Sequence, residues 1–167
     1  MRHLWRAPGT PRTAEHLSGR DKGNLRPYVR QDHPVQAAPE GFNQMNKLIT
    51  AIRKHLDPAF VKPNNLKYRP ADAKASWGCC YYAVEALYYL GARNEGFVPA
   101  YIRLEEDYNV CIFSTHWVLI HPSGRVLDPT ADQFSFTPDY QSVRRCGFQT
   151  KQPSARAKRL MKLVEAK

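Results

Sequence analysis

Apolar residues recur with helical spacing in two segments that lie far apart in the chain. The first covers residues 41–60, and Pro58 ends its pattern. The second covers residues 153–167, where Ser154 suits the N-cap position of a basic amphipathic helix. The apolar positions are Phe42, Met45, Leu48, Ile49, Ile52 and Leu56 in the first segment, and Ala157, Leu160, Met161 and Val164 in the second. Each pattern predicts a helix with one face against a core.

A third helical pattern lies in the middle of the chain, in "WGCCYYAVEALYYLGA" at residues 77–92. Gly91 suits the end of this helix. Tyrosines extend its apolar surface around most of the circumference, and a helix that is apolar on nearly all sides is normally buried. The segment therefore predicts the central helix of the fold. Its apolar stripe consists of Ala83, Ala86, Leu87 and Leu90.

The segments after residue 97 have the patterns of β-strands. In "VPAYIRLEE" apolar and polar side chains alternate, which predicts a strand with one buried face. Residues 109–121 are more continuously apolar, as in a central strand, and "HPSGR" and "RVLDPT" predict a turn and a short strand. Residues 61–76 predict a long loop. Helices followed by an antiparallel sheet predict an α+β fold in which the buried helix packs on the sheet.

Residues 1–40 are rich in Arg, Pro, Gly and Gln and show little apolar periodicity. This composition predicts a loosely ordered basic arm, followed by one domain at residues 41–167. No apolar run reaches the roughly 18 residues of a membrane span, and the first residues lack the apolar region of a secretory signal. We therefore expect a cytoplasmic protein without a membrane partner.

The net charge of +10 is unevenly distributed. Residues 1–70 contain 13 Lys and Arg against 5 Asp and Glu, residues 71–140 contain 4 against 9, and residues 141–167 contain 8 against 1. Basic ends are usually solvated surface or contacts to an anionic partner, nucleic acid above all. Because no known reader motif is present, the charge predicts non-specific contact with nucleic acid through the two ends.

The four cysteines do not form a disulfide or zinc pattern. Adjacent cysteines rarely bridge each other, and without a secretory signal we expect reduced thiols. The chain has no C-x-x-C motif and no pair of His at ligand spacing, so no metal and no cofactor are expected. The cysteines are Cys79, Cys80, Cys111 and Cys146.

Cys79 and Cys80 both fall in the first turn of the central helix, where the helix dipole favours a thiolate. With successive residues about 100° apart around the axis, Cys79 lies on the apolar stripe and Cys80 lies on its shoulder. This placement predicts packing for Cys79 and a position at the edge of a cleft for Cys80.

His116 is the candidate base, and the turn after its strand predicts a partner for it. A three-residue hairpin loop with Gly124 in the left-handed conformation pairs His121 with Arg125. In that register Asp128 lies diagonal to His116 on the same face of the sheet, within reach of the imidazole. A two-residue loop would instead put Asp128 on the other face.

Each of these residues also has an ordinary structural interpretation. A Cys in an apolar helix usually packs in the core, a single His in a strand is usually a packing residue, and Asp-Pro often ends a strand. Their combination favours a triad in which His116 takes the proton of the Cys80 thiol and Asp128 orients the imidazole. Glu85, inside the buried helix, is expected to pair with an Arg or Tyr in a structural role.

The motifs "GCC", "THWVLI" and "GRVLDPT" resemble the transglutaminase-like branch of the papain-like thiol enzymes. The order of Cys, His and Asp is the same, and so is the short gap between His and Asp. This resemblance implies a papain-like fold with Cys80 as nucleophile, His116 as base and Asp128 as its orienting partner. Papain-like proteases use an upstream Gln in the oxyanion hole, and no clear one precedes Cys80. We therefore regard Trp77, Cys79 and Gln133 as oxyanion or substrate-positioning candidates.

Residues 77–157 are also similar to a group of small uncharacterised bacteriophage proteins, through "G-x-C-Y-x-A-x-E-A", "H-W" and "D-P-T-A-D-Q-F". A phage-encoded chain would act in the host cytoplasm. The sequence thus predicts a cysteine hydrolase or acyltransferase that acts on a protein, peptide or other amide by hydrolysis, deamidation or transamidation. The alternative is a catalytically inactive basic protein on the same fold that binds nucleic acid or a host factor.

Overall fold

The computed structural model describes residues 40–104 and 115–166. Cys111 and all of the expected arm except Glu40 lie outside these residues. The described part belongs to one compact unit that spans residues 37–167. None of its helices has the length and apolarity that crossing a bilayer requires.

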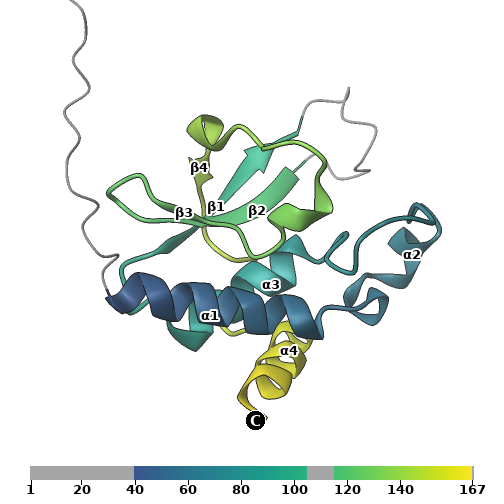
Figure 1. Cartoon of the computed structure of the whole chain (residues 1–167), viewed down its shortest axis with the longest axis horizontal. Coiled ribbons are helices and arrows are strands. Elements are labelled where there is room, and N and C mark those ends of the chain that lie inside the picture. The colour runs from purple at the N-terminus through teal and green to yellow at the C-terminus, as the bar shows by residue number, and fades with distance from the viewer. Residues whose placement is uncertain (1–39, 105–114, 167) are drawn as a thin grey trace, which may run out of the picture. The chain divides into compact units, whose positions relative to one another are not determined.

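The described residues form helices packed against an antiparallel sheet, which confirms the α+β class. The strand order is β3-β2-β1-β4. Figure 1 shows α1, α3 and α4 below the sheet. The helices are α1 (Glu40–His55), α2 (Pro63–Leu66), α3 (Cys80–Leu87) and α4 (Ala155–Glu165), and the strands are β1 (Val98–Arg103), β2 (Thr115–Ile120), β3 (Val126–Leu127) and β4 (Arg144–Arg145).

Helix α3 is the centre of the fold, as the sequence predicts. It contacts α1 and α4 on one side and β2 on the other. All of its residues except Tyr81 are buried. The helix is shorter than its apolar pattern, because the α-helical turns stop at Leu87 and a wider turn, Tyr88–Ala92, carries the chain past Gly91.

Apart from β3, which the sequence predicts as a short strand, the shortest elements were not predicted. The segment expected as a loop, residues 61–76, contains the single helical turn α2, which begins at Pro63 in the first helical position. Strand β4 and the 3-10 turns are also too short to leave a periodic pattern. These turns are Pro58–Phe60, Ala131–Gln133 and Tyr140–Ser142.

The two faces of the sheet carry different clusters of apolar side chains. Trp117 and Leu119 of β2 pack with the main core around α3. Val118 packs with Ala100 and Ile102 of β1 in a second, smaller cluster. Because side chains alternate along a strand, His116 lies on the same face as Val118, away from the face that packs on α3.

A buried carboxylate joins α3 to the start of α4. Glu85 is fully buried, and its two carboxylate oxygens accept hydrogen bonds from the Ser154 backbone N–H at 3.1 Å and from the Ser154 hydroxyl at 2.6 Å. The Ser154 hydroxyl oxygen in turn accepts from the N–H of Ala157, which confirms Ser154 as the N-cap of α4. The expected Arg or Tyr partner of Glu85 is wrong, since Ser154 provides both of these hydrogen bonds.

Ser154→Ala should lower the free energy of unfolding by about 1–3 kcal/mol, because it removes the N-cap and one donor to a buried carboxylate. Urea unfolding at neutral pH measures the change. Ser135→Ala is the matched control, because the Ser135 side chain is exposed in the loop between the 3-10 turns Ala131–Gln133 and Tyr140–Ser142. Equal stability of the two variants would contradict the role given to the Glu85–Ser154 contact.

Candidate functional site

The hairpin between β2 and β3 has the register that its turn sequence predicts. The N–H of His121 donates to the carbonyl oxygen of Arg125 at 2.8 Å, and Gly124 has a φ of 86°. Left-handed backbone of this kind favours glycine, because a Cβ would be strained there. Leu119 pairs with Leu127, one step before the position of Asp128. The three-residue loop is therefore confirmed.

This register brings Asp128 to His116. The Nε2 atom of His116 lies 2.7 Å from the Oδ2 atom of Asp128. The His116 side chain is 1% exposed and that of Asp128 is 6% exposed. A carboxylate only accepts hydrogen bonds, so Nε2 carries the proton, and Nδ1 is left as the nitrogen that can accept one from a thiol.

The Asp128 carboxylate also binds groups from the segment that follows it. The Tyr140 hydroxyl donates to Oδ2 at 2.9 Å, and the N–H of Thr130 donates to Oδ1 at 2.9 Å. Burial, with the nearby charge of Asp128, raises the pKa of Tyr140, so its hydroxyl stays a donor. These bonds fix the orientation of the carboxylate toward His116.

Helix α1 holds the backbone of the loop that carries Asp128. The guanidinium of Arg53 donates to the carbonyl oxygens of Pro129 at 2.9 Å and of Asp128 at 3.1 Å. Further along the same loop, the carboxylate of Asp132 accepts a hydrogen bond from the Ser76 hydroxyl at 3.0 Å. This bond joins the loop to the segment in front of α3. The loop that carries Asp128 is thus attached both to α1 and to the start of the helix that carries Cys80.

Cys80 is the first residue of α3 and lines a cavity of about 370 Å³. The chain turns into the helix at Gly78, whose φ is 70°. Cys80 is 9% exposed, whereas His116 does not line the cavity. N–H groups in the first turn of a helix have no intrahelical acceptor, so the backbone beside the thiol can bind an oxyanion.

The half of β2 that carries His116 is an incomplete part of the sheet. Strand β3 pairs with only Leu119 and Ile120 of β2, and the chain then turns away at Asp128. The first half of β2 is therefore not covered by β3. The side chain of Cys80, at the N-terminus of α3, raises the pKa of His116, although His116 belongs to the face away from α3.

The pKa of His116 depends on its burial and on two neighbouring side chains, Asp128 and Cys80. Burial by itself lowers the pKa of the imidazole, because it disfavours the charged form. The side chains of Asp128 and Cys80 act in the opposite direction and raise the pKa from 6.5 to about 9. Both therefore stabilise the imidazolium that forms when His116 takes a proton.

Cys79 has a different environment from Cys80. Its side chain is fully buried in the main core, and its sulfur contacts backbone carbonyl oxygens, that of Trp77 at 3.6 Å among them. Burial and the negative charges nearby raise the pKa of the Cys79 thiol to about 12. A thiol with that pKa remains protonated at neutral pH, which agrees with the packing role expected for Cys79.

The other two positioning candidates differ in their contacts. Trp77 is buried in the main core and does not line the cavity. Gln133 contacts His116 at Nδ1, the ring nitrogen that does not bind Asp128. Its amide nitrogen is 3.3 Å from Nδ1 and donates to the Thr130 carbonyl oxygen at 3.1 Å, and its amide oxygen accepts from the Gly78 N–H at 3.4 Å. These contacts make Gln133 a brace between the ring and the start of α3.

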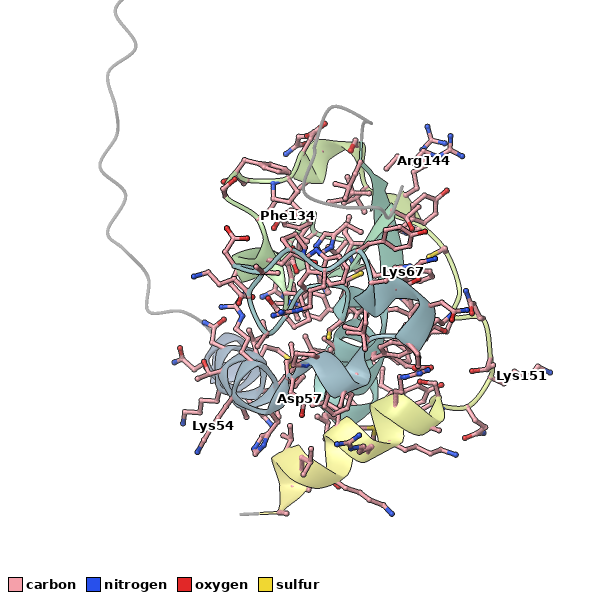
Figure 2. The ribbon with its side chains drawn as sticks, turned by 90° about the vertical axis from the view of Figure 1, so that its right-hand side faces the viewer. Lys54, Asp57, Lys67, Phe134, Arg144 and Lys151 are labelled. Atoms are coloured by element: carbon pink, nitrogen blue, oxygen red, sulfur yellow. The ribbon has the colours of Figure 1, made fainter. Side chains whose placement is uncertain are left out.

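The sequence reasoning missed the hydrogen-bonding roles of Arg53, Thr130 and Tyr140. Each acts across the fold or through a turn without regular periodicity, and its side-chain type alone carries no signal. Phe134 was also missed, and it meets the His116 ring edge to face with centroids 4.7 Å apart. Figure 2 labels Phe134 in the upper part of the described unit.

Comparisons with protein-family models, with curated proteins and with solved structures found no match to this chain. Within residues 40–104 and 115–166, no three His, Cys, Asp or Glu side chains gather in a way that could hold a metal ion. The functional assignment therefore depends on the chemistry of the site itself.

The raised pKa of His116 predicts a pH dependence of stability. A pKa that rises from 6.5 to about 9 on folding stabilises the protein fully below pH 6.5, and this contribution is lost as the pH rises through 9. We expect the loss to be about 3 kcal/mol, since one pKa unit corresponds to about 1.4 kcal/mol. Urea unfolding at pH 6 and pH 10 measures it.

His116→Gln is the control, because glutamine keeps a hydrogen-bonding side chain but does not titrate. The variant should lose less stability than the wild-type protein between the same two pH values. The same loss in both proteins would contradict the assignment of the effect to His116.

Proposed function

We propose that the protein is a thiol-dependent acyl-transfer enzyme with a papain-like arrangement, in which Cys80 is the nucleophile. The observation that carries the proposal is the buried His116–Asp128 pair at 2.7 Å, whose imidazole is also acted on by Cys80. A hydrogen-bonded carboxylate, an imidazole and a thiol at a helix N-terminus are the groups needed to make a thiolate near neutral pH.

In the proposed reaction, His116 Nδ1 takes the proton of the Cys80 thiol, and the thiolate sulfur attacks the carbonyl carbon of an amide. The new C–S bond pushes the carbonyl electrons onto oxygen, where N–H groups of the first turn of α3 stabilise them. When the C–N bond breaks, the imidazolium returns its proton to the leaving amine. Water or another amine then attacks the thioester, His116 takes the proton of that nucleophile, and the thiol is released.

Asp128 has a positioning role in this scheme. It holds the Nε2 proton and stabilises the imidazolium, while Tyr140 and Thr130 keep the carboxylate in place. Hydrolysis, deamidation and transamidation share these steps, and they differ in the amide that enters and in the nucleophile that resolves the thioester. The substrate class in this proposal is accordingly a protein, peptide or other amide.

The test is the reactivity of the thiols. At pH 7 iodoacetamide should alkylate Cys80 faster than the other cysteines, as measured by mass spectrometry of digested protein. His116→Ala should slow this reaction by about tenfold or more, because the base that generates the thiolate is lost. Asp128→Asn should also slow it, by a smaller factor, since the imidazole remains.

Cys146→Ser is the matched control and should leave the rate at Cys80 unchanged. The backbone N–H of Cys146 donates to the carbonyl oxygen of Pro99, and Cys146 does not line the cavity at Cys80. Thermal unfolding verifies that each variant is folded. Slow and equal labelling of all thiols in the wild-type protein would contradict the proposal. Nucleic-acid binding that falls with salt and survives Cys80→Ser would then favour the non-catalytic basic protein.

A further inference from the structure

The cavity at Cys80 has charges of one sign. Two of its lining residues are charged, Lys62 and Arg156, and both are positive, while the other lining residues within the described chain are neutral. They come from different elements: Lys62 immediately precedes α2, and Arg156 is the second residue of α4. Figure 2 shows α2 in front, near the Lys67 label, and the loop with Lys151 that leads to α4 at the right-hand edge.

Arg156 is held in the wall of the cavity. Its guanidinium lies over the ring of Tyr82, 5.3 Å from the centroid. A guanidinium has five N–H donors, and stacking on a ring leaves donors for a ligand. The carboxylate of Glu85 is the negative group behind this wall, and it is already bound to Ser154.

The rest of the lining is partly aromatic and partly polar. Tyr81 and Trp117 meet edge to face with centroids 4.9 Å apart, and both line the cavity beside Cys80. A space of about 370 Å³ lies at the lower end of the range of about 300–1,000 Å³ for small-molecule pockets. It therefore suits a short apolar stem that ends in an anionic group, with a carbonyl within reach of the thiol.

From this arrangement we infer that the substrate is an acidic peptide, which places a carboxylate between Lys62 and Arg156 while Cys80 attacks the neighbouring amide. The inference rests on the proposed function, because it needs Cys80 to be the attacking thiol. The two cations bind the carboxylate and do not take part in bond making, so they determine specificity without being catalytic residues.

A pair of small reagents tests the inference. Iodoacetate and iodoacetamide both alkylate thiols by displacement of iodide, but only iodoacetate carries a carboxylate. The rate constant for Cys80 with each reagent is measured at pH 7 by mass spectrometry and divided by that of glutathione under the same conditions. We expect the corrected rate constant to be higher for iodoacetate than for iodoacetamide.

Lys62→Gln and Arg156→Gln should each lower the iodoacetate rate by about two- to fivefold, as expected for the loss of one partly exposed ion pair. Neither should change the iodoacetamide rate by a comparable factor. Lys62→Arg should retain the preference, because it keeps the charge. Lys67→Gln is the matched control, because Lys67 is exposed on the same segment, contacts Tyr68 and does not line the cavity.

The possible failures have different meanings. Fast labelling of Cys80 by both reagents without a preference for iodoacetate would overturn the acidic substrate and leave the thiol enzyme intact. A preference that survives Lys62→Gln and Arg156→Gln would also overturn it, since the His116 imidazolium would then explain the effect. If Lys67→Gln lowered the iodoacetate rate by the same factor, net charge would explain the effect, and the inference would be overturned. Slow labelling of Cys80 by both reagents would overturn the proposed function and the inference together.

Discussion

The carboxylate of Asp128 determines where most groups of the candidate site lie. It binds the imidazole of His116, the hydroxyl of Tyr140 and the backbone of Thr130, so strand β2 and the segment after Asp128 converge on two oxygen atoms. A buried charge is tolerated only when such partners satisfy it. The same requirement that makes the carboxylate stable inside the protein therefore also fixes the orientation of the imidazole.

The relation between His116 and Asp128 could be predicted from the sequence because local chemistry controls it. The residues "PSG" select a loop length, the loop length sets the register, and the register puts both side chains on one face. Helix α3 and the separation of Cys79 from Cys80 were predictable for a similar reason, since a helical stripe distinguishes a buried first turn from its shoulder.

The supporting residues could not be found in this way. Arg53 reaches the Asp128 loop from more than 70 residues earlier in the chain, and Tyr140 reaches it from a 3-10 turn without periodicity. The partner of Glu85 was missed because Ser154 was considered only as the N-cap of α4. Its hydroxyl also donates to the Glu85 carboxylate on α3. Contacts of this kind depend on tertiary packing, and single-sequence patterns report only on neighbours along an element.

The link between Glu85 and Ser154 has a consequence for how the protein is made. The nucleophile candidate is at residue 80, but the wall of its cavity includes Ser154 and Arg156, near the end of the chain. During synthesis on the ribosome, the segment with Cys80 is complete long before the residues that close the cavity have been translated. The completed cavity therefore forms only after α4 has emerged and docked on α3.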